Sequence, residues 1–342
     1  MPFTHDALII GQGLAGTVLS ETLATRGLSV MVFDARQVGS ASHVAAGVVN
    51  PIVLRRTLPS WRASEMLAVA GAYYRELELD QEAHYWKPLP FVEIFPTAQE
   101  AAIWQLRMRD AEHKHMLSSA PVSDASLEKL PHPYGYGVVL RCAWLNLQAM
   151  MADHRERLIA SGALEERIIL ESDIIRKADG IEVLGRSAPL LVHCGGPFNT
   201  VPGLVPVRGE GLTVRLPGLG MNCMVHRGAF IVPMGDDVYR VGSTFAWDDV
   251  WSGPTDEGKR HLLDRLHRLW SGPIEVLDHW AGVRPASKDR RPIMGRTGPH
   301  EAVLSGFGAR GGLLAPWCAA HLADHLLNGK PLDPEVDVQR FA

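Results

Sequence analysis

Apolar and polar positions at the start of the chain follow a strand–turn–helix–strand order. Residues 7–10 form a short apolar run typical of a buried strand, and the glycine-rich residues 11–16 follow directly. Apolar residues then recur at helical spacing through residues 14–24, with Gly27 placed to end the helix. A second apolar run, residues 28–33, ends at Asp34. The pattern predicts a β–α–β unit.

The rest of the pattern predicts separate helices and groups of short strands. Amphipathic spacing predicts helices over residues 61–82, 100–116, 145–160, 256–270 and 314–327, and Gly162 and Gly329 are placed to end two of them. Short apolar runs predict strands within residues 168–192, an antiparallel sheet within 205–244 and a strand at 302–304. Prolines alternate with apolar residues over 87–96, which predicts an extended segment at a sheet edge.

Composition narrows the class of protein. A chain of 342 residues, 46% of them hydrophobic, is long enough for about two domains. The formal net charge is only −4 and like charges do not cluster, so we expect neither a nucleic-acid partner nor an anionic membrane surface. No apolar stretch reaches the ~18 residues of a membrane helix, and the run at 7–10 is too short for a signal peptide. We expect a cytoplasmic protein.

Cysteine and histidine spacing gives no metal or disulfide signal. The four cysteines lie far apart and form no C-x-x-C pair, which favours reduced thiols. His321 and His325 share a helical face at i, i+4 spacing, but no glutamate follows His321 as it would in a zinc-binding helix. We therefore predict no metal site.

The glycine-rich turn predicts a nucleotide site. Residues 11–16, GQGLAG, follow a strand and open a helix: Gly11 permits the tight turn, Gly13 lets a pyrophosphate approach, and Gly16 allows close packing of helix on strand. The helix N-terminus directs free N–H groups at the phosphates. Asp34 ends the second strand about 20 residues later, where an acid that binds the ribose hydroxyls is expected.

Two alternatives remain open at this site. Arg36, two residues after Asp34, either favours a ribose 2′-phosphate or is a surface charge. A nicotinamide-dependent dehydrogenase would explain the first segment equally well, so the choice of cofactor depends on the rest of the chain.

Further blocks follow in a fixed order along the chain. They read SASHVAAG at 40–47, HCGGP at 193–197, PVRGE at 206–210, GVRPASKDRRP at 282–292 and GFGARGGLLAP at 306–316. Together with the first turn and Asp34, these blocks resemble the FAD-dependent D-amino-acid oxidase, glycine oxidase and sarcosine oxidase family. The resemblance spans nearly the whole chain and argues against a nicotinamide dehydrogenase.

The resemblance implies a two-domain α/β flavoprotein. A Rossmann-like FAD-binding domain would be assembled from residues 1–52, 140–204 and 285–342, with an inserted substrate domain of mixed or antiparallel sheet at 53–139 and 205–284. Family members with covalent flavin attach it through a cysteine in the segment that matches 282–284. No cysteine lies there in this chain, which implies non-covalent FAD.

The matching positions imply a set of FAD contacts. Small residues at 45–47 and 306–312 would let the main chain lie against the flavin ring, and the amides of residues 311–313 would stabilise negative charge near flavin N1 and the C2 carbonyl. The implied cofactor-binding residues are Gly11, Gly13, Leu14, Ala15, Gly16, Asp34, Ala35, Arg36, Ala41, Ser42, Ala45, Ala46, Gly47, Gly195, Gly308, Arg310, Gly311, Gly312 and Leu313.

The resemblance also implies catalytic and substrate residues. Arg284 matches the arginine that grips the substrate carboxylate, for which a planar guanidinium is suited, although a structural ion pair is the alternative. Arg310 would orient the substrate or pair with a nearby carboxylate. Phe230 lies at a substrate position where glycine oxidases carry a carboxylate-binding tyrosine, so recognition of glycine itself is in doubt. His226, Arg227 and Tyr239 are weaker substitutes for that hydroxyl.

The implied reaction is oxidation of the C–N bond of a small amine or amino acid by hydride transfer to flavin N5. Within the family, GARGGLLAP and the GSTF sequence at 242–245 also resemble the oxidase half of the wobble-uridine tRNA-modifying enzyme, which is the alternative. A third possibility is a flavoprotein subunit that does not turn over amines. The sequence leaves open the amine, the electron acceptor and the oligomeric state.

Overall fold

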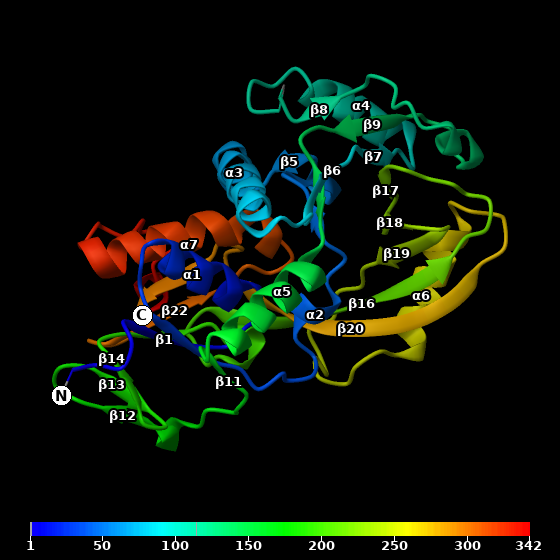
Figure 1. Cartoon of the computed structure of the whole chain (residues 1–342). Coiled ribbons are helices and arrows are strands. Elements are labelled where there is room, and N and C mark those ends of the chain that lie inside the picture. Colours follow the sequence, from blue (N-terminus) through cyan, green and yellow to red (C-terminus); the bar gives the residue numbers. More distant parts are fainter. Residues whose placement is uncertain (1, 114) are drawn as a thin grey trace. The chain divides into compact units, whose positions relative to one another are not determined.

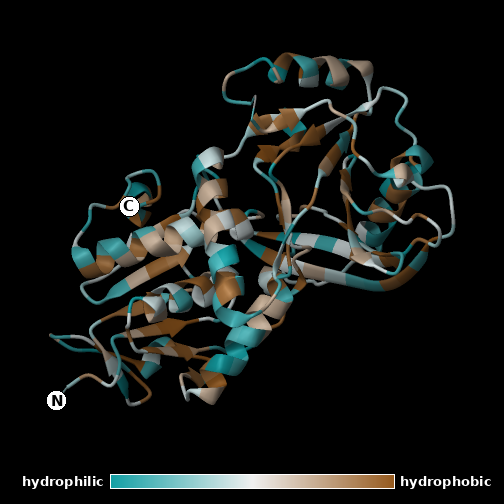
Figure 2. Ribbon diagram, turned by 45° about the horizontal axis from the view of Figure 1, so that its top comes forward, coloured by the Kyte–Doolittle hydropathy of each residue, from teal (hydrophilic) through white to brown (hydrophobic). Residues whose placement is uncertain are grey.

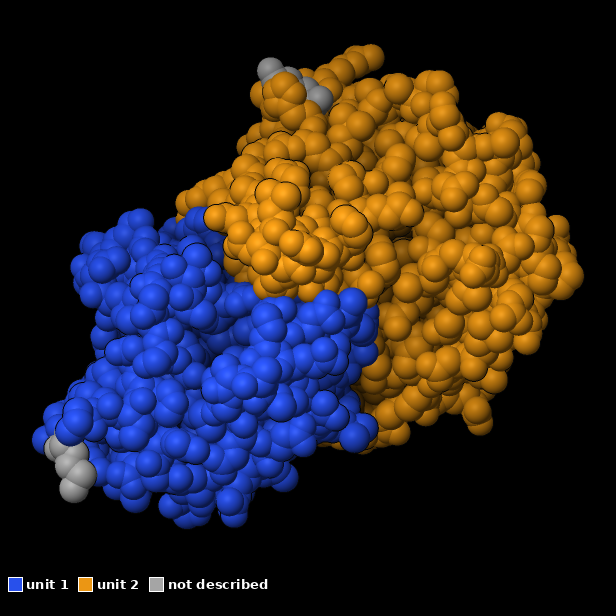
Figure 3. All heavy atoms as spheres, viewed as in Figure 1, with its two compact units in different colours: residues 1–43, 147–207, 283–342 blue, residues 44–146, 208–282 orange. Residues whose placement is uncertain are grey.

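The structure is a computed structural model that describes residues 2–113 and 115–342, and its elements are labelled in Figure 1. The chain divides into two compact units, coloured separately in Figure 3. Unit 1 comprises residues 1–43, 147–207 and 283–342, and unit 2 comprises residues 44–146 and 208–282.

Unit 1 is built on a six-stranded sheet. Five strands are mutually parallel, and the sixth pairs antiparallel at one edge. In spatial order they are β11 (Leu164–Glu165), β2 (Val30–Phe33), β1 (Ala7–Ile10), β15 (Leu191–His193), β22 (Glu301–Ser305) and β21 (Ile293–Arg296). Strands β1 and β2 are apolar throughout, as expected for a parallel sheet covered on both faces, and Figure 2 shows hydrophobic residues concentrated on the strands.

Three long helices complete unit 1: α1 (Leu14–Thr25), α5 (Leu147–Ala160) and α7 (Gly311–Asn328). Each ends where a glycine turns the chain in the left-handed region: Gly27 at φ +81°, Gly162 at φ +69° and Gly329 at φ +65°. The predicted helix ends are therefore confirmed, because these turns need a residue without a Cβ.

Unit 1 also carries smaller elements. A three-stranded antiparallel sheet joins β12 (Ile174–Arg176), β13 (Ile181–Val183) and β14 (Arg186–Ala188). Short 3₁₀ turns cover Glu171–Asp173, Gly196–Phe198 and Val338–Phe341, and the short helix α2 spans Ala41–Val44.

Unit 2 contains an eight-stranded mixed sheet. All registered pairs within it are antiparallel except the parallel pair β17–β7. In spatial order the strands are β20 (Glu275–Ser287), β16 (Leu204–Arg215), β19 (Val238–Gly242), β18 (Phe230–Gly235), β17 (Met224–His226), β7 (Phe91–Ile94), β9 (Tyr136–Val139) and β8 (Leu117–Ser118). The predicted α/β fold with a mixed-sheet second part is confirmed.

The remaining elements of unit 2 are short strands and three helices. A second sheet runs β3 (Val48–Val49), β10 (Ala143–Leu145) and β6 (Trp86–Pro88), and β4 (Ile52–Val53) pairs with β5 (Leu58–Pro59). The helices are α3 (Ala63–Gln81), α4 (Ala98–Arg107) and α6 (Asp256–His267), with 3₁₀ turns at Leu54–Arg56 and Ala125–Lys129. Because β3 and β10 pair in this sheet, residues 44–52 and 140–146 group with unit 2.

Two element predictions were wrong in part. The predicted edge segment 87–96 begins in β6, which lies at the edge of the three-stranded sheet, but it also contains β7, which lies inside the large sheet between β17 and β9. Its prolines fall outside Phe91–Ile94, so that stretch keeps every backbone donor that pairing on both sides requires. The helix predicted at 100–116 ends at Arg107 instead; His113 is buried and its Nε2 lies 3.1 Å from the Thr57 carbonyl oxygen, while Lys114 lies outside the described residues.

The length and apolarity of the helices bear on whether the chain could cross a membrane. Among the described residues, no helix is both long and apolar enough to cross a bilayer.

Candidate FAD site and active site

The candidate site begins at the carboxyl edge of the unit 1 sheet. Strands β1, β2, β15 and β22 run parallel, so their carboxyl ends meet at one edge. The segments that follow them are residues 11–16, Asp34, residues 194–197 and residues 306–312. Ligands of open α/β sheets bind at this edge, beside the strands where the chain changes direction across the sheet.

Close backbone approach explains the glycines of the first turn. A Cβ on Gly11, whose φ is +101°, would lie 2.7 Å from the Cys194 carbonyl oxygen. A Cβ on Gly16 would lie 1.8 Å from the Gly11 carbonyl oxygen. These two positions therefore exclude a side chain, and the turn folds tightly against Cys194, the residue that follows β15.

Two helices present their N-termini at the same place. Gly311 packs so closely on Leu14 that a Cβ there would lie 2.6 Å from Leu14 Cδ2, while at the other end Arg26 is paired with Asp324 at 2.8 Å. Helices α1 and α7 therefore run parallel, side by side in Figure 1. Neither helix has an acidic residue in its first turn. Two positive dipole ends without a compensating acid form a favourable site for an anion.

Ser42 closes this site on the side of the first turn. Its Oγ accepts a hydrogen bond from the Leu14 amide at 3.2 Å and lies 3.3 Å from the Cβ position of Gly13. A hydroxyl can both accept from the helix and donate to a phosphate oxygen. Ser42 and Gly13, both predicted cofactor-binding residues, therefore lie together at the N-terminus of α1.

Asp34 is held in a network at the end of β2. Its Oδ1 accepts from the Gln12 amide at 2.9 Å, and its Oδ2 accepts from the Arg36 amide at 3.2 Å and from Arg155 Nη1 at 2.9 Å. The Arg36 side chain turns away to the exposed Glu166, with 3.3 Å between Nε and Oε1. The guanidinium of Arg155, through its hydrogen bond, is the main cause that holds the pKa of Glu166 below its usual value.

Gln12 and Arg155 were missed by the sequence analysis. Gln12 occupies a variable position of the glycine motif, and Arg155 is a charged residue on an amphipathic helix, where a solvated side chain is the ordinary expectation. The only sequence signal is the position of Arg155 on α5: residues Met151, His154 and Leu158, on neighbouring turns, are all buried.

The last glycine turn is fixed by its own backbone and by β20. Gly306 and Gly308 adopt φ of +78° and +55°, and the Gly308 amide donates to the Pro285 carbonyl at 2.9 Å. The Leu313 amide donates to the Arg310 carbonyl at 3.0 Å, so it is engaged within the first turn of α7. A donor role toward the flavin for residues 311–313 stays a prediction.

Arg284 is fixed on both sides along β20. The preceding residue, Val283, donates its amide to the Gly39 carbonyl at 2.7 Å, and the following residue, Pro285, accepts from Gly308. Desolvation lowers the pKa of Arg284 to about 10, and desolvation with the charge of Arg290 lowers the pKa of Arg310 to about 10. Both guanidinium groups are charged at neutral pH, although burial disfavours the charged form. A bound anion would stabilise that charge.

In unit 2, the carbonyl groups of residues 45–47 accept hydrogen bonds that hold this segment in place. Arg240 Nη1 donates to the Ala45 carbonyl at 2.7 Å, Trp144 Nε1 donates to Ala46 at 3.1 Å, and the Leu145 amide donates to Gly47 at 2.8 Å. Sequence reasoning named Ala45, Ala46 and Gly47 but not the side chains that hold them, because these come from strands far along the chain.

Phe230 and its proposed substitutes have identifiable contacts within unit 2. The Phe230 ring covers Gly242, where a Cβ would lie 2.7 Å from the ring. His226 Nδ1 is 2.7 Å from Glu93 Oε2, Arg227 Nη1 donates to the carbonyls of Pro131 and Arg268, and the buried Tyr239 hydroxyl accepts from the Met221 amide. These contacts account for His226, Arg227 and Tyr239 without a substrate.

The two histidines of α7 serve packing. His321 Nε2 accepts from the Asp333 amide and His325 Nδ1 contacts the Lys330 carbonyl, so both hold the chain that follows α7. In the described ranges, no group of three potential metal ligands occurs.

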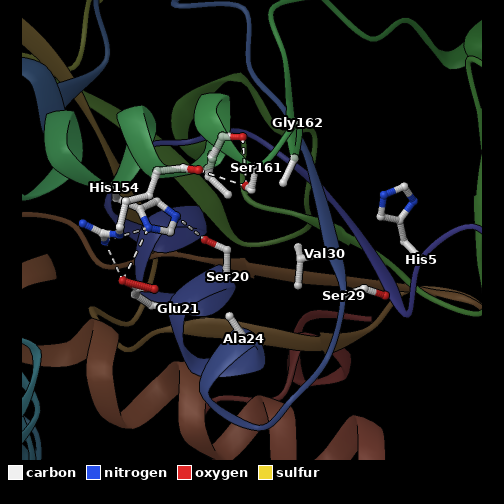
Figure 4. Close-up of a pocket in the computed structure, with 12 residues that line it drawn as sticks. His5, Ser20, Glu21, Ala24, Ser29, Val30, His154, Ser161 and Gly162 are labelled. Carbon is white, nitrogen blue, oxygen red and sulfur yellow. Dashed lines mark hydrogen bonds and ion pairs between the residues drawn. The ribbon is translucent and has the colours of Figure 1, made fainter. Parts of the chain in front are cut away.

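A serine–histidine–acid contact lines a pocket beside the start of β2 (Figure 4). Ser20 Oγ lies 2.7 Å from His154 Nε2, and His154 Nδ1 lies 3.6 Å from Glu21 Oε1. Ser20 is 2% exposed and donates to the Thr17 carbonyl within α1, so a substrate could not reach it. The contact joins α1 to α5 at the amino edge of the sheet, opposite to the nucleotide edge.

Comparison with known proteins decides the family. The model of the FAD dependent oxidoreductase family matches residues 6–325. The chain belongs to the FAD dependent oxidoreductase family. FAD is its cofactor, and the chain is an oxidoreductase.

Relatives of this FAD dependent oxidoreductase fall into two groups. By sequence, it is 27% identical to the tRNA 5-methylaminomethyl-2-thiouridine biosynthesis bifunctional protein MnmC of Burkholderia ambifaria, over 99% of this chain and 60% of that protein. By structure, it resembles glycine oxidase from Bacillus cereus (TM-score 0.81, 19% identity, 96% of each chain) and iminodiacetate oxidase from Chelativorans (TM-score 0.80, 20% identity, 98% of each chain). The chain thus spans about 60% of the curated relative's length.

The residues at the carboxyl edge fit FAD. The paired N-termini of α1 and α7 suit the pyrophosphate, and Asp34 suits the ribose of the adenosine. Four residues of the turn at 306–312 have no side chain, so the main chain there can lie against a flat ring: Gly306, Gly308, Gly311 and Gly312. Bound FAD supplies a two-electron acceptor, and the chain supplies its orientation.

Proposed function

We propose that this FAD dependent oxidoreductase oxidises the C–N bond of a small amine that carries a carboxylate, an amino acid in the broad sense. The observation that carries the proposal is Arg284: a desolvated guanidinium whose backbone neighbours are bonded to Gly39 and to the Gly308 turn. The structural relatives named for glycine and iminodiacetate oxidation act on substrates of this class.

In the proposed reaction Arg284 binds the substrate carboxylate through two parallel hydrogen bonds and so orients the carbon next to nitrogen. Bound FAD would take up the hydride that this carbon releases, and the neutral amine would become an iminium ion. Water would then hydrolyse the iminium ion to a carbonyl compound and an ammonium ion or a protonated amine. The N-terminus of α7 stabilises negative charge that develops nearby. If the amine binds in its neutral form, its lone pair assists the release of hydride, and no side chain is needed to remove a proton.

The alternative substrate is a uridine side chain of tRNA. It is favoured by the name of the sequence relatives, which are more similar to this chain than the structural relatives are. The net charge of −4 supplies no general attraction for a polyanion. A small-molecule partner and a cytoplasmic location belong to the main proposal.

The experiment compares amino acids with their decarboxylated amines under anaerobic conditions, read by loss of the flavin's visible absorbance. Wild type should prefer the acid. Arg284→Ala should lose ~2–5 kcal/mol of apparent transition-state binding for the acid, the scale for truncating one partner of a buried charge pair. Arg284→Lys should recover only part, because an ammonium cannot make the planar two-pronged contact.

The matched control is Arg296→Ala, an exposed arginine of the same unit whose Nη1 binds the Pro299 carbonyl. It should leave the preference for the acid unchanged. Equal losses for acid and amine in Arg284→Ala would make Arg284 structural. Bleaching by bulk tRNA and by no small amine would establish the alternative, and no bleaching by either would indicate a subunit that does not turn over amines.

A further inference from the structure

Arg155 reaches the adenosine end of the cofactor site from helix α5. The residue is only 6% exposed, yet its guanidinium contacts three polar groups. Nη1 lies 2.9 Å from Asp34 Oδ2 and 3.1 Å from Gln12 Oε1, and Nη2 donates to Glu166 Oε1. A buried charge needs such partners, and here one of them is the acid that the fold places at the ribose.

The rest of the network is rigid. Gln12 Nε2 donates to Thr17 Oγ1 at 3.1 Å and to the Met151 carbonyl at 2.9 Å, so the amide that faces Arg155 cannot rotate freely. The Gln12 backbone amide holds the other oxygen of Asp34. The Asp34 carboxylate is therefore fixed from two sides, by its own turn and by α5.

One donor of the guanidinium is left over. Arg155 Nε is buried and, within the described residues, has no hydrogen-bond partner. A buried N–H without an acceptor is costly, and such groups in folded proteins usually have an identifiable purpose. This nitrogen is enclosed by protein atoms, so a ligand cannot reach it, and Arg155 acts on the cofactor site through Asp34.

We propose that Arg155 is a cofactor-positioning residue for the adenosine half of FAD: it fixes the Asp34 carboxylate in the orientation that binds the ribose. The proposal depends on FAD as cofactor and is independent of which amine is oxidised. The competing interpretation is an ion pair that only joins α5 to the sheet.

The test uses apo-protein and two probes, FAD and ADP, which share the adenosine diphosphate but not the flavin. Arg155→Met keeps the length of the side chain and removes its donors. It should weaken FAD and ADP by the same factor, about tenfold to a hundredfold, the range for a hydrogen bond that involves a charged group. Arg155→Lys keeps the charge but cannot contact Asp34, Gln12 and Glu166 together, so it should keep the apo-protein folded and restore only part of the affinity.

Arg157→Met is the matched control: this arginine lies on the same helix, pairs with Glu21 and lines the pocket of Figure 4 at the opposite edge. It should leave both Kd values unchanged, whatever its effect on the Tm of the apo-protein. A double mutant with Asp34→Asn should lose less than the sum of the single losses. Unchanged FAD and ADP affinity in Arg155→Met, or full recovery in Arg155→Lys, would overturn the proposal. A wild type that bound no FAD would overturn the cofactor itself and, with it, this role.

Discussion

At the scale of single residues, desolvation dominates the behaviour of Arg284. Its folded pKa is about 10, below the usual value for arginine, because burial disfavours the charged form. Below pH 10 the guanidinium is protonated in both folded and unfolded states, so the desolvation cost to stability is fully present. That cost decreases as pH rises above about 10, because the folded protein releases the proton before the unfolded chain does.

The same shift predicts a pH limit for carboxylate binding. A carboxylate needs the charged guanidinium, so the affinity for acetate, which has no titrating amine, should fall above pH 10, about tenfold per unit. The measurement is competitive inhibition by acetate between pH 8 and 11, with a neutral amide, acetamide, as the comparison. Inhibition by acetate that stayed constant to pH 11 would remove Arg284 from the anion site.

Some residues near the candidate site could be placed from the sequence and others could not, for a physical reason. Asp34 could be placed because its distance from the glycine turn is set by one strand–helix–strand unit, and the structure puts it at the end of β2. Arg155, 121 positions further along, could not be placed, because only the folded sheet brings α5 beside β2. The same holds for Arg240, whose partner Ala45 is 195 positions away.

At the scale of elements, the site depends on two parallel helices whose like dipole ends lie together. Side-by-side parallel dipoles are unfavourable by themselves, so bound pyrophosphate should stabilise this pair. Helices α1, α5, α6 and α7 were predicted within a few residues, since helical periodicity is local. The position of β7 inside the large sheet was not predicted, because the strand order depends on pairing with β17, which is more than a hundred residues away.

Gly16 provides the element-scale test. Gly16→Ala would put a Cβ 1.8 Å from the Gly11 carbonyl oxygen, so α1 must shift away from the turn. We expect a protein that retains little or no FAD and unfolds at a lower Tm, with a cost of ~1–3 kcal/mol or more, as for overpacking.

Gly27→Ala is the control, because Gly27 has the strained φ of +81° but open space around its Cβ position. It should lower stability by about 1 kcal/mol, the scale of a residue forced into the left-handed region, and leave FAD affinity unchanged. Equal FAD retention in the two variants would show that the close approach at Gly16 does not shape the cofactor site.

At the scale of the whole molecule, unit 1 is assembled from three separate stretches that carry the four segments at its carboxyl edge. The order of these blocks was readable from the sequence, since each is a short glycine-rich motif. The unit boundaries at 43–44 and 146–147 were not, because they depend on β3 pairing with β10 rather than with the first sheet.

The last prediction concerns how the whole protein holds its flavin. All four cysteines, Cys142, Cys194, Cys223 and Cys318, are buried, and burial raises the pKa of the first three thiols. A thiol without thiolate character is a poor nucleophile toward the flavin ring, so the cofactor should be held by hydrogen bonds and helix dipoles alone. The purified protein should be yellow, and acid precipitation should leave FAD, identified by mass, in the supernatant. Asp34→Ala should be purified with less flavin, because the ribose hydroxyls lose a charged acceptor. Flavin that stayed in the acid pellet would contradict the non-covalent assignment and direct attention to a reactive side chain near the ring.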